Sequence, residues 1–258
     1  MKALILAAGY ATRLRPLTDE WAKELLPVGG RPIIDWILDA VVQVDAVDQV
    51  HVVTNARKAA WFEAWAAGRD VVVHDDGTIS NDDRLGAIGD MQFVIDRAGL
   101  DDDLLVIAGD NLFDYRIADL VDFWESKDAP DTRASAVAVR DVGSLELAAQ
   151  YGIVTLDDDG RIVAFEEKPA EPHTTLAATA TYLFAREHAA LIRSYLAAGE
   201  PPDQPGRYVE WLHRREPVYG WVFDSTWYDV GNHEQLLEAD NRMRRQSGLP
   251  VRDVYSPE

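Results

Sequence analysis

The chain has 258 residues, no cysteine, and a formal net charge of −20 from 45 acidic and 25 basic side chains. This charge excludes a nucleic acid or an anionic membrane as a partner, and the lack of cysteine excludes disulfides and thiolate metal sites. No apolar run reaches the ~18 residues that span a bilayer, and the N-terminus lacks the pattern of a signal peptide, so we expect a cytoplasmic protein. The acidity itself is explained either by solubility in a salt-rich environment or by a few carboxylates that hold a divalent metal.

The first residues predict a buried strand of a parallel sheet, because residues 2–6 are mostly apolar and short in extent. The small residues Ala7, Ala8 and Gly9 follow directly, and the cations Arg13, Arg15 and Lys23 come soon afterwards. Small side chains let backbone N–H groups approach an anion closely, and the cations favour phosphate. We therefore predict that a nucleotide binds where this strand ends.

Helix and strand patterns then alternate. Apolar residues recur at helical spacing behind Pro32, over residues 33–42. The next predicted elements are a strand at 49–54, a helix at 57–67 and a strand at 70–74. Such βαβαβ alternation implies right-handed crossovers and a parallel sheet.

The middle of the chain holds the first candidate metal ligand. After a polar loop at 75–84, the pattern predicts a helix around 91–98 and a buried central strand at 104–108, which ends in Gly109, Asp110 and Asn111. A carboxylate at the carboxyl end of a central strand lies beside the ligand crevice of the sheet. Asp110 is therefore either a metal ligand or an aspartate that caps the next turn.

The second half of the chain predicts shorter strands. We expect them at residues 134–140, 151–156, 162–167, 179–184 and 217–223, with a hairpin turn at 157–160. Helices are expected at 188–198, at 208–213 and from a capping box at Asn232 and Gln235 to about 245, with a connector at 200–206. The tail, 248–258, has the composition of frayed coil.

Four motifs in order resemble the sugar-1-phosphate nucleotidylyltransferase family. The first is Gly9-Tyr-Ala-Thr-Arg-Leu-Arg-Pro-Leu-Thr18 with Lys23-Glu-Leu-Leu-Pro-Val28. The others are Gly109-Asp110-Asn111, Tyr151-Gly152 with Glu167-Lys168-Pro169, and Trp227-Tyr-Asp-Val-Gly231. Ala11 and Ala180 stand where the family usually has glycine, and Ala22 replaces a proline. At Ala11, either the turn has negative φ or its grip on phosphate is altered, and Ala180 adds a methyl group near the sugar.

The resemblance implies an α/β fold, a Rossmann-like three-layer sandwich with a mostly parallel mixed central sheet and a small β-rich sugar-binding lobe. It implies a single domain, residues 1–246, with an NTP-binding half at 1–130, a sugar-binding half at 131–246 and a tail at 247–258. By motif match, Arg13, Lys23 and Asp110 are catalytic, and Asp110 and Asp229 bind Mg²⁺. The residues implied at the NTP are Leu6, Ala7, Ala8, Gly9, Thr12, Arg13 and Gly86, and those at the sugar phosphate are Gly152, Glu167, Lys168 and Tyr182.

The implied reaction joins an NTP to a sugar-1-phosphate, giving an NDP-sugar and pyrophosphate by in-line attack on the α-phosphorus. Two alternatives stay open: a cytidylyltransferase for a polyol or amino-alcohol phosphate, and a silent relative that binds a nucleotide-sugar as a regulatory subunit. The sequence does not fix the nucleobase, the acceptor or whether the chain forms a homo-oligomer. A Rossmann dehydrogenase and a P-loop NTPase are disfavoured, since the Gly-x-Gly-x-x-Gly and Gly-Lys-Ser/Thr patterns are missing.

Overall fold

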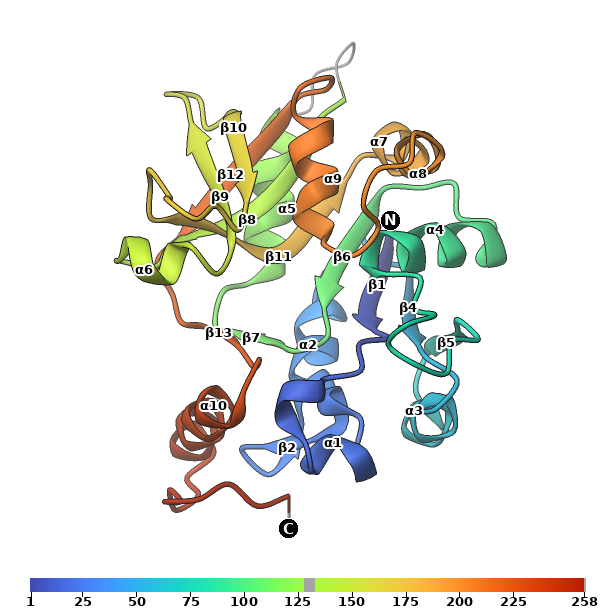
Figure 1. Cartoon of the computed structure of the whole chain (residues 1–258), viewed down its shortest axis with the longest axis vertical. Coiled ribbons are helices and arrows are strands. Elements are labelled where there is room, and N and C mark those ends of the chain that lie inside the picture. The colour runs from blue at the N-terminus through green and yellow to red at the C-terminus, as the bar shows by residue number, and fades with distance from the viewer. Residues whose placement is uncertain (128–132, 258) are drawn as a thin grey trace.

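A computed structural model describes residues 1–127 and 133–257 and places a mixed sheet at the centre of the protein (Figure 1). Its main path runs β10-β9-β11-β6-β1-β4-β5, with β8 paired to β11 and β12 paired to β8. All of these strands except β10 and β11 point in the same direction. The strands are β1 (Lys2–Ala7), β4 (Gln49–Thr54), β5 (Val71–Asp75), β6 (Leu104–Ala108), β8 (Ser135–Asp141), β9 (Gly152–Leu156), β10 (Ile162–Glu167), β11 (Leu176–Phe184) and β12 (Val218–Phe223).

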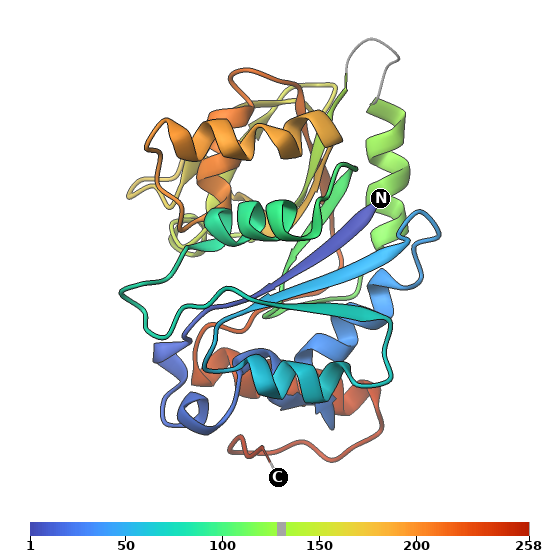
Figure 2. The same ribbon diagram turned by 90° about the vertical axis from the view of Figure 1, so that its right-hand side faces the viewer.

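Helices cover both faces of the sheet, and each face has its own apolar core. One core includes side chains of α2 (Ile33–Val41), α3 (Ala59–Ala66), α5 (Ile117–Lys127) and α10 (His233–Gln246). The other includes side chains of α4 (Ala87–Ala98), α7 (Arg186–Ala190), α8 (Ile192–Ala197) and α9 (Pro205–Leu212). Figure 2 shows α4 and the orange helices on one side of the strands and α5 and α2 on the other. The predicted α/β, Rossmann-like three-layer sandwich is confirmed.

The first strand lies at the middle of the parallel region. β1 pairs with β4 on one side and with β6 on the other, both in parallel. Its residues Ala3, Leu4 and Ile5 are completely buried, which explains why the run is apolar at successive positions and does not alternate. Parallel strands end at the same edge of a sheet, so the residues after β1 and after β6 are brought together.

Several boundaries differ from the sequence prediction. Helix α4 begins at Ala87 and not near 91, because Gly86 takes a φ of 78° and turns the chain into the helix. Helix α9 begins at Pro205, inside the predicted connector, since the fixed φ of proline suits the first turn of a helix. The helix expected at 188–198 is divided into α7 and α8, and β11 begins at Leu176, before 179.

Two short strands near the site were not predicted. β7 (Asn111–Phe113) pairs in antiparallel register with β13 (Trp227–Asp229), so that Asp229 is opposite Asn111. Segments far apart in the sequence are thereby joined next to Asp110. Other elements outside the main sheet are η1 (Thr12–Leu14), α1 (Leu17–Glu20), η2 (Lys23–Leu25), β2 (Pro27–Val28), β3 (Arg31–Pro32) and α6 (Leu145–Ala148).

The last helix and the tail are held more firmly than the sequence suggested. The Asn232 side chain caps α10 by accepting a hydrogen bond from Gln235 N, as predicted, but the Gln235 side chain accepts from Gly231 N. The tail is not frayed coil. The Asn241 side chain bonds to both backbone groups of Arg252, and the Tyr255 hydroxyl donates to Pro27 O over 2.9 Å.

The predicted boundary between the two halves, at 130 and 131, lies outside the described residues, as does the last residue of the predicted tail. Within residues 1–127 and 133–257, no helix combines the length and the apolar character that crossing a membrane requires.

Candidate active site

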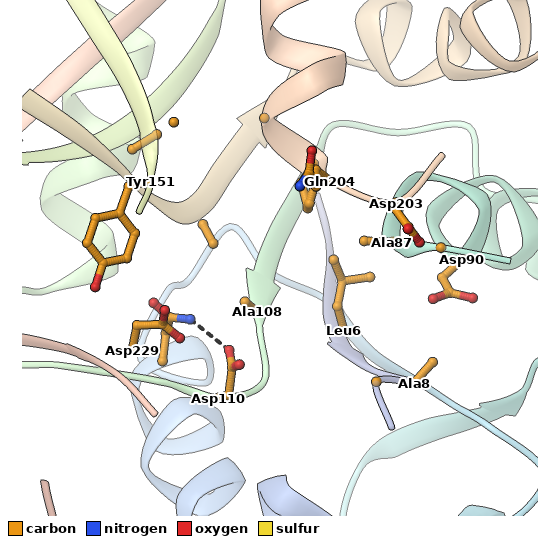
Figure 3. Close-up of a pocket in the computed structure, with 18 of the residues that line it drawn as sticks. Leu6, Ala8, Ala87, Asp90, Ala108, Asp110, Tyr151, Asp203, Gln204 and Asp229 are labelled. Carbon is orange, nitrogen blue, oxygen red and sulfur yellow. Dashed lines mark hydrogen bonds between the residues drawn. The ribbon is translucent and has the colours of Figure 1, made fainter. Parts of the chain in front are cut away.

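A cavity of about 420 Å³ opens at the carboxyl ends of β1 and β6. One end, which we call the helix end, is formed at the start of α4 by Gly86, Ala87 and Asp90. The other, the hairpin end, is formed by Gly152, Glu167 and Lys168 of the β9–β10 hairpin. Figure 3 shows Ala87, Asp90 and Asp203 together at the helix end, well apart from Tyr151 and Asp229. The further lining residues are Leu6, Ala8, Gly9, Tyr10, Arg13, Lys23, Glu24, Asp76, Asn81, Arg84, Ala108, Asp110, Asn111, Gln150, Tyr151, Ala178, Ala180, Tyr182, Asp203, Gln204, Pro205, Gly206, Trp227 and Asp229.

The loop after β1 is held from several directions. The Asn55 side chain donates to Ala8 O over 2.9 Å, and the buried Lys58 ammonium donates to the carbonyls of Thr18 and Trp21. His233, in the first turn of α10, lies 3.0 Å from Arg15 O through Nε2. These hydrogen bonds hold the loop in place. Arg13, which lies in this loop, lines the cavity.

Three residues other than glycine have positive φ in the described part of the chain: Ala11 (45°), Lys168 (50°) and Ala180 (54°). Ala11 is therefore left-handed, so the alternative of a negative φ at that turn is wrong. Lys168 and Ala180 both line the cavity. Strained backbone of this kind is concentrated at functional sites, where the surrounding structure holds it in place.

A lysine and two carboxylates meet where β6 ends. The Lys23 ammonium forms an ion pair with Oδ2 of Asp110, and Asn111 donates to Oδ1 over 2.8 Å. Asp229 is brought to the same place by the pairing of β13 with β7, and Val230 N donates to Asp110 O. Figure 3 shows Asp110, which lies between β6 and β7, as a neighbour of Asp229 at the end of β13.

Burial and neighbouring charges shift the pKa values of this group. Burial acts to raise the pKa of Asp110, but the Lys23 ammonium and its hydrogen bond outweigh burial and hold that pKa below its usual range. Burial and the negative charge of Asp110 raise the pKa of Asp229 to about 6. Burial also raises the pKa of Glu24, next to Lys23, to about 7. The cations Lys23, Arg13 and Lys168 act in the opposite direction and favour the ionised form of Asp229.

Asp110 and Asp229 are the residues that could hold a metal. Mg²⁺ is usually bound by one or two carboxylates and completes its shell with phosphates and water. No cluster of three or more His, Cys, Asp or Glu side chains suited to a metal occurs in residues 1–127 and 133–257. Two carboxylates beside an open cavity therefore fit a cation that arrives with phosphate, and do not fit a site closed by protein ligands alone.

Polar and aromatic side chains gather at the hairpin end. The Glu167 carboxylate lies against Gly152 and Gly206, and burial raises its pKa although Lys168 and Arg207 lie near. Tyr151 packs edge to face on Trp227, with 5.0 Å between ring centroids. Tyr182, in β11, is almost completely buried and contributes to the same wall.

The cavity gathers most of the residues that the sequence singled out. Leu6, Ala8, Gly9, Arg13, Lys23, Gly86, Asp110, Gly152, Glu167, Lys168, Tyr182 and Asp229 all line it. Ala7 and Thr12 do not. The side chain of Ala7 packs into the core on the sheet face covered by α2 and α5. Thr12 is exposed at the start of η1.

Other lining residues were missed by the sequence reasoning. Asp90 was placed before its helix, because the start of α4 was predicted four residues too late. Asp203 and Gln204 were assigned to a connector, yet Pro202 and Asp203 accept hydrogen bonds from Ile88 N and Ala87 N at the start of α4. The proline in Gln204-Pro205-Gly206 was the available signal for a helix start.

The sequence profile of the nucleotidyl transferase family matches residues 2–246. The chain is 30 % identical over 241 residues to the bifunctional protein GlmU of Methanocaldococcus jannaschii, covering 93 % of this chain and 53 % of that protein. It is 28 % identical over 251 residues to a UTP–glucose-1-phosphate uridylyltransferase of Synechocystis, covering 93 % and 62 %. The chain thus spans between half and two thirds of the length of these relatives. A solved structure of a Bacillus anthracis protein described as a glucose-1-phosphate thymidylyltransferase, in complex with sucrose, has the same fold, with a TM-score of 0.81, 24 % identity and 95 % coverage of both chains.

Proposed function

The chain belongs to the nucleotidyl transferase family, and from this membership we propose that it joins an NTP to a sugar-1-phosphate. The products are an NDP-sugar and pyrophosphate. The observation that carries the proposal is the single cavity that unites Arg13, Lys23, Asp110 and Asp229 with Glu167 and Lys168. We also propose the cytoplasm as the compartment, because the sequence contains no cysteine from which a disulfide could form.

The two ends of the cavity suggest a division of labour. The loop after β1 and, apart from Asp203, the helix end come from the first half of the chain, proposed at 1–130, and would bind the NTP. The hairpin end comes from the proposed second half, 131–246, and would bind the sugar phosphate. Within this scheme Leu6, Ala8, Gly9 and Gly86 contact the base and ribose, while Gly152, Glu167 and Tyr182 contact the sugar.

The chemistry needs alignment and neutralisation of charge more than proton transfer, because the attacking phosphate oxygen is already ionised. That oxygen forms a bond to the α-phosphorus as the bond to the leaving pyrophosphate oxygen breaks. Arg13 holds the β- and γ-phosphates and stabilises the departing pyrophosphate. Lys23 donates to the α-phosphate, and Lys168 neutralises the incoming phosphate. Asp110 and Asp229 would hold Mg²⁺, which as a Lewis acid reduces the repulsion between the two polyanions.

The alternatives are less well supported. The names of the relatives favour glucose-1-phosphate as the kind of acceptor over a polyol or amino-alcohol phosphate. A silent nucleotide-sugar binder would not need both carboxylates together with Arg13 and Lys23 around one cavity, and in this chain all four line the same cavity.

The test is release of pyrophosphate with Mg²⁺, for each of UTP, dTTP, CTP, ATP and GTP with hexose-1-phosphates and with ribitol and choline phosphates. We expect release with a sugar-1-phosphate, loss in Asp110→Asn, and activity like that of the unmodified protein in Asp119→Asn, since Asp119 is half-exposed on α5 and does not line the cavity. Release only with ribitol or choline phosphate would replace the proposed acceptor. Nucleotide-sugar binding without release for any pair would favour the silent binder.

A further inference from the structure

At the helix end, the buried side chain of Asp90 has a polar atom without a partner. Asp90 lies in the first turn of α4 and is only 6 % exposed, yet it is part of the cavity lining. Its Oδ1 has no hydrogen-bond partner within the described residues. A buried acceptor that is left unsatisfied is unfavourable, and a donor on a ligand in the cavity would relieve this.

Asp76 affects the protonation of the Asp90 carboxyl group. Burial, the charge of Asp76 and a hydrogen bond between the two side chains raise the pKa of Asp90 to about 8. Asp76 in turn accepts from Thr78 N over 2.7 Å. Near neutral pH the two carboxyls therefore share a proton, and the hydrogen of Asp90 is directed to Asp76. The unpaired oxygen that remains is an acceptor.

The charged neighbours at this end form hydrogen bonds with one another and with the backbone. Asp203 also lines the cavity and forms two hydrogen bonds with the Arg84 guanidinium, through Nε and Nη2. The remaining Nη1 of Arg84 donates to Asn81 O. The backbone N–H groups of Ala87 and Ile88 are bound to the carbonyls of Asp203 and Pro202. A ligand in this place thus meets carboxyl oxygens from Asp76, Asp90 and Asp203.

We propose that Asp90 reads the nucleobase, and that the preferred NTP carries an exocyclic amino group, as ATP, CTP and GTP do. The proposal rests on the nucleotidyl transfer proposed above, which places the base at this end. An amino group donates to Oδ1 of Asp90. Uracil and thymine instead offer a single imino N–H between two carbonyl oxygens, and these carbonyls would face carboxyl oxygens of Asp76 and Asp203.

Binding of the five NTPs to the full chain, measured by calorimetry with Mg²⁺ and without an acceptor, tests the proposal separately from turnover. We expect at least one amino-bearing NTP to bind roughly tenfold more tightly than UTP and dTTP, the size of one hydrogen bond. Asp90→Ala, which removes the acceptor, should reduce this preference by a similar factor, and Asp90→Asn should keep it, because its amide group donates to Asp76 and its oxygen remains an acceptor. Asp96→Ala is the matched control, since Asp96 is on the same helix and pairs with Arg193 at the surface.

Tighter binding of UTP or dTTP by the unmodified protein would overturn the proposal, as would an unchanged order of affinities in Asp90→Ala. Should Asp90→Ala fail to fold, Asp90→Leu provides the second variant, because it also lacks an acceptor at this position, and it should change the order in the same way. Failure of the proposed function is distinguishable. In that case no combination of an NTP and an acceptor phosphate releases pyrophosphate, whatever the order of NTP affinities.

Discussion

Gly206 leaves the space that the Glu167 carboxylate occupies: a Cβ built at residue 206 would lie 1.9 Å from Oε2 of Glu167. Gly206 is in the first turn of α9, and Glu167 ends β10, so the contact ties the helix to the hairpin end of the cavity. Even the smallest side chain at this position must displace the carboxylate that we propose to bind the sugar.

Gly206→Ala should therefore raise the KM for the acceptor by about tenfold, the effect of one lost hydrogen bond, with the affinity for NTP unchanged. Steady-state kinetics with each substrate varied in turn would measure this. Glu167→Gln should have a similar effect. Glu166→Gln, the exposed neighbour in β10, should have none. Equal KM values for the acceptor in all three variants would remove Glu167 from the sugar site.

Ala11→Gly should stabilise the protein. Ala11 has a φ of 45°, a conformation that costs a residue with a Cβ about 1 kcal/mol and costs glycine almost nothing. We expect a gain of that size in the free energy of unfolding, measured with urea. The same substitution at Ala64, exposed in the middle of α3, should instead destabilise by roughly 0.5–1 kcal/mol. A loss at both positions would contradict the left-handed turn.

A buried histidine pair predicts acid sensitivity. His51 Nδ1 lies 2.9 Å from His74 Nε2, and both side chains are buried in neighbouring strands. Burial, followed by the nearby His74, lowers the pKa of His51 to about 4. The unfolded chain then binds more protons between pH 6.5 and 4, so stability is lost as the pH falls through this window, by roughly 3 kcal/mol.

Urea unfolding at pH 7, 6, 5 and 4 would measure that loss. Replacing both residues, His51→Leu with His74→Leu, should flatten the pH dependence. The exposed His173→Leu should leave it unchanged. A double variant with the slope of the unmodified protein would show that other groups cause the acid sensitivity.

Much of the fold was accessible from the sequence because local patterns and packing agree. The buried strands β1 and β6 read as continuous apolar runs, and β4, β6 and β10 begin and end as predicted. The pattern failed where the decisive partner is distant in the chain. β7 and β13 are three residues each, and they form only because they pair with one another across the fold.

The residues of the candidate site also fall into two groups: those that a local sequence pattern predicts and those that depend on a distant partner. Asp110 could be found because it follows a central strand, and Arg13 and Lys23 because they are cations after a small-residue turn. No comparable sequence pattern pointed to Asp90 or Gly206. The buried state of Asp90 depends on Asp76, which is at the end of another strand, and the role of Gly206 depends on the Glu167 side chain. Relationships of this kind are visible only when the chain is folded.

The central claim is that Asp110 and Asp229 support transfer of a nucleotidyl group to a sugar phosphate in this cavity. Phosphorus NMR of a reaction with Mg²⁺, the preferred NTP and a hexose-1-phosphate tests it most directly. We expect resonances of a sugar diphosphate diester and of pyrophosphate in equal amounts. Asp229→Asn should abolish both, and Asp224→Asn, an exposed residue of the same segment, should preserve them. Nucleoside monophosphate without the diester, or full activity in Asp229→Asn, would contradict the account.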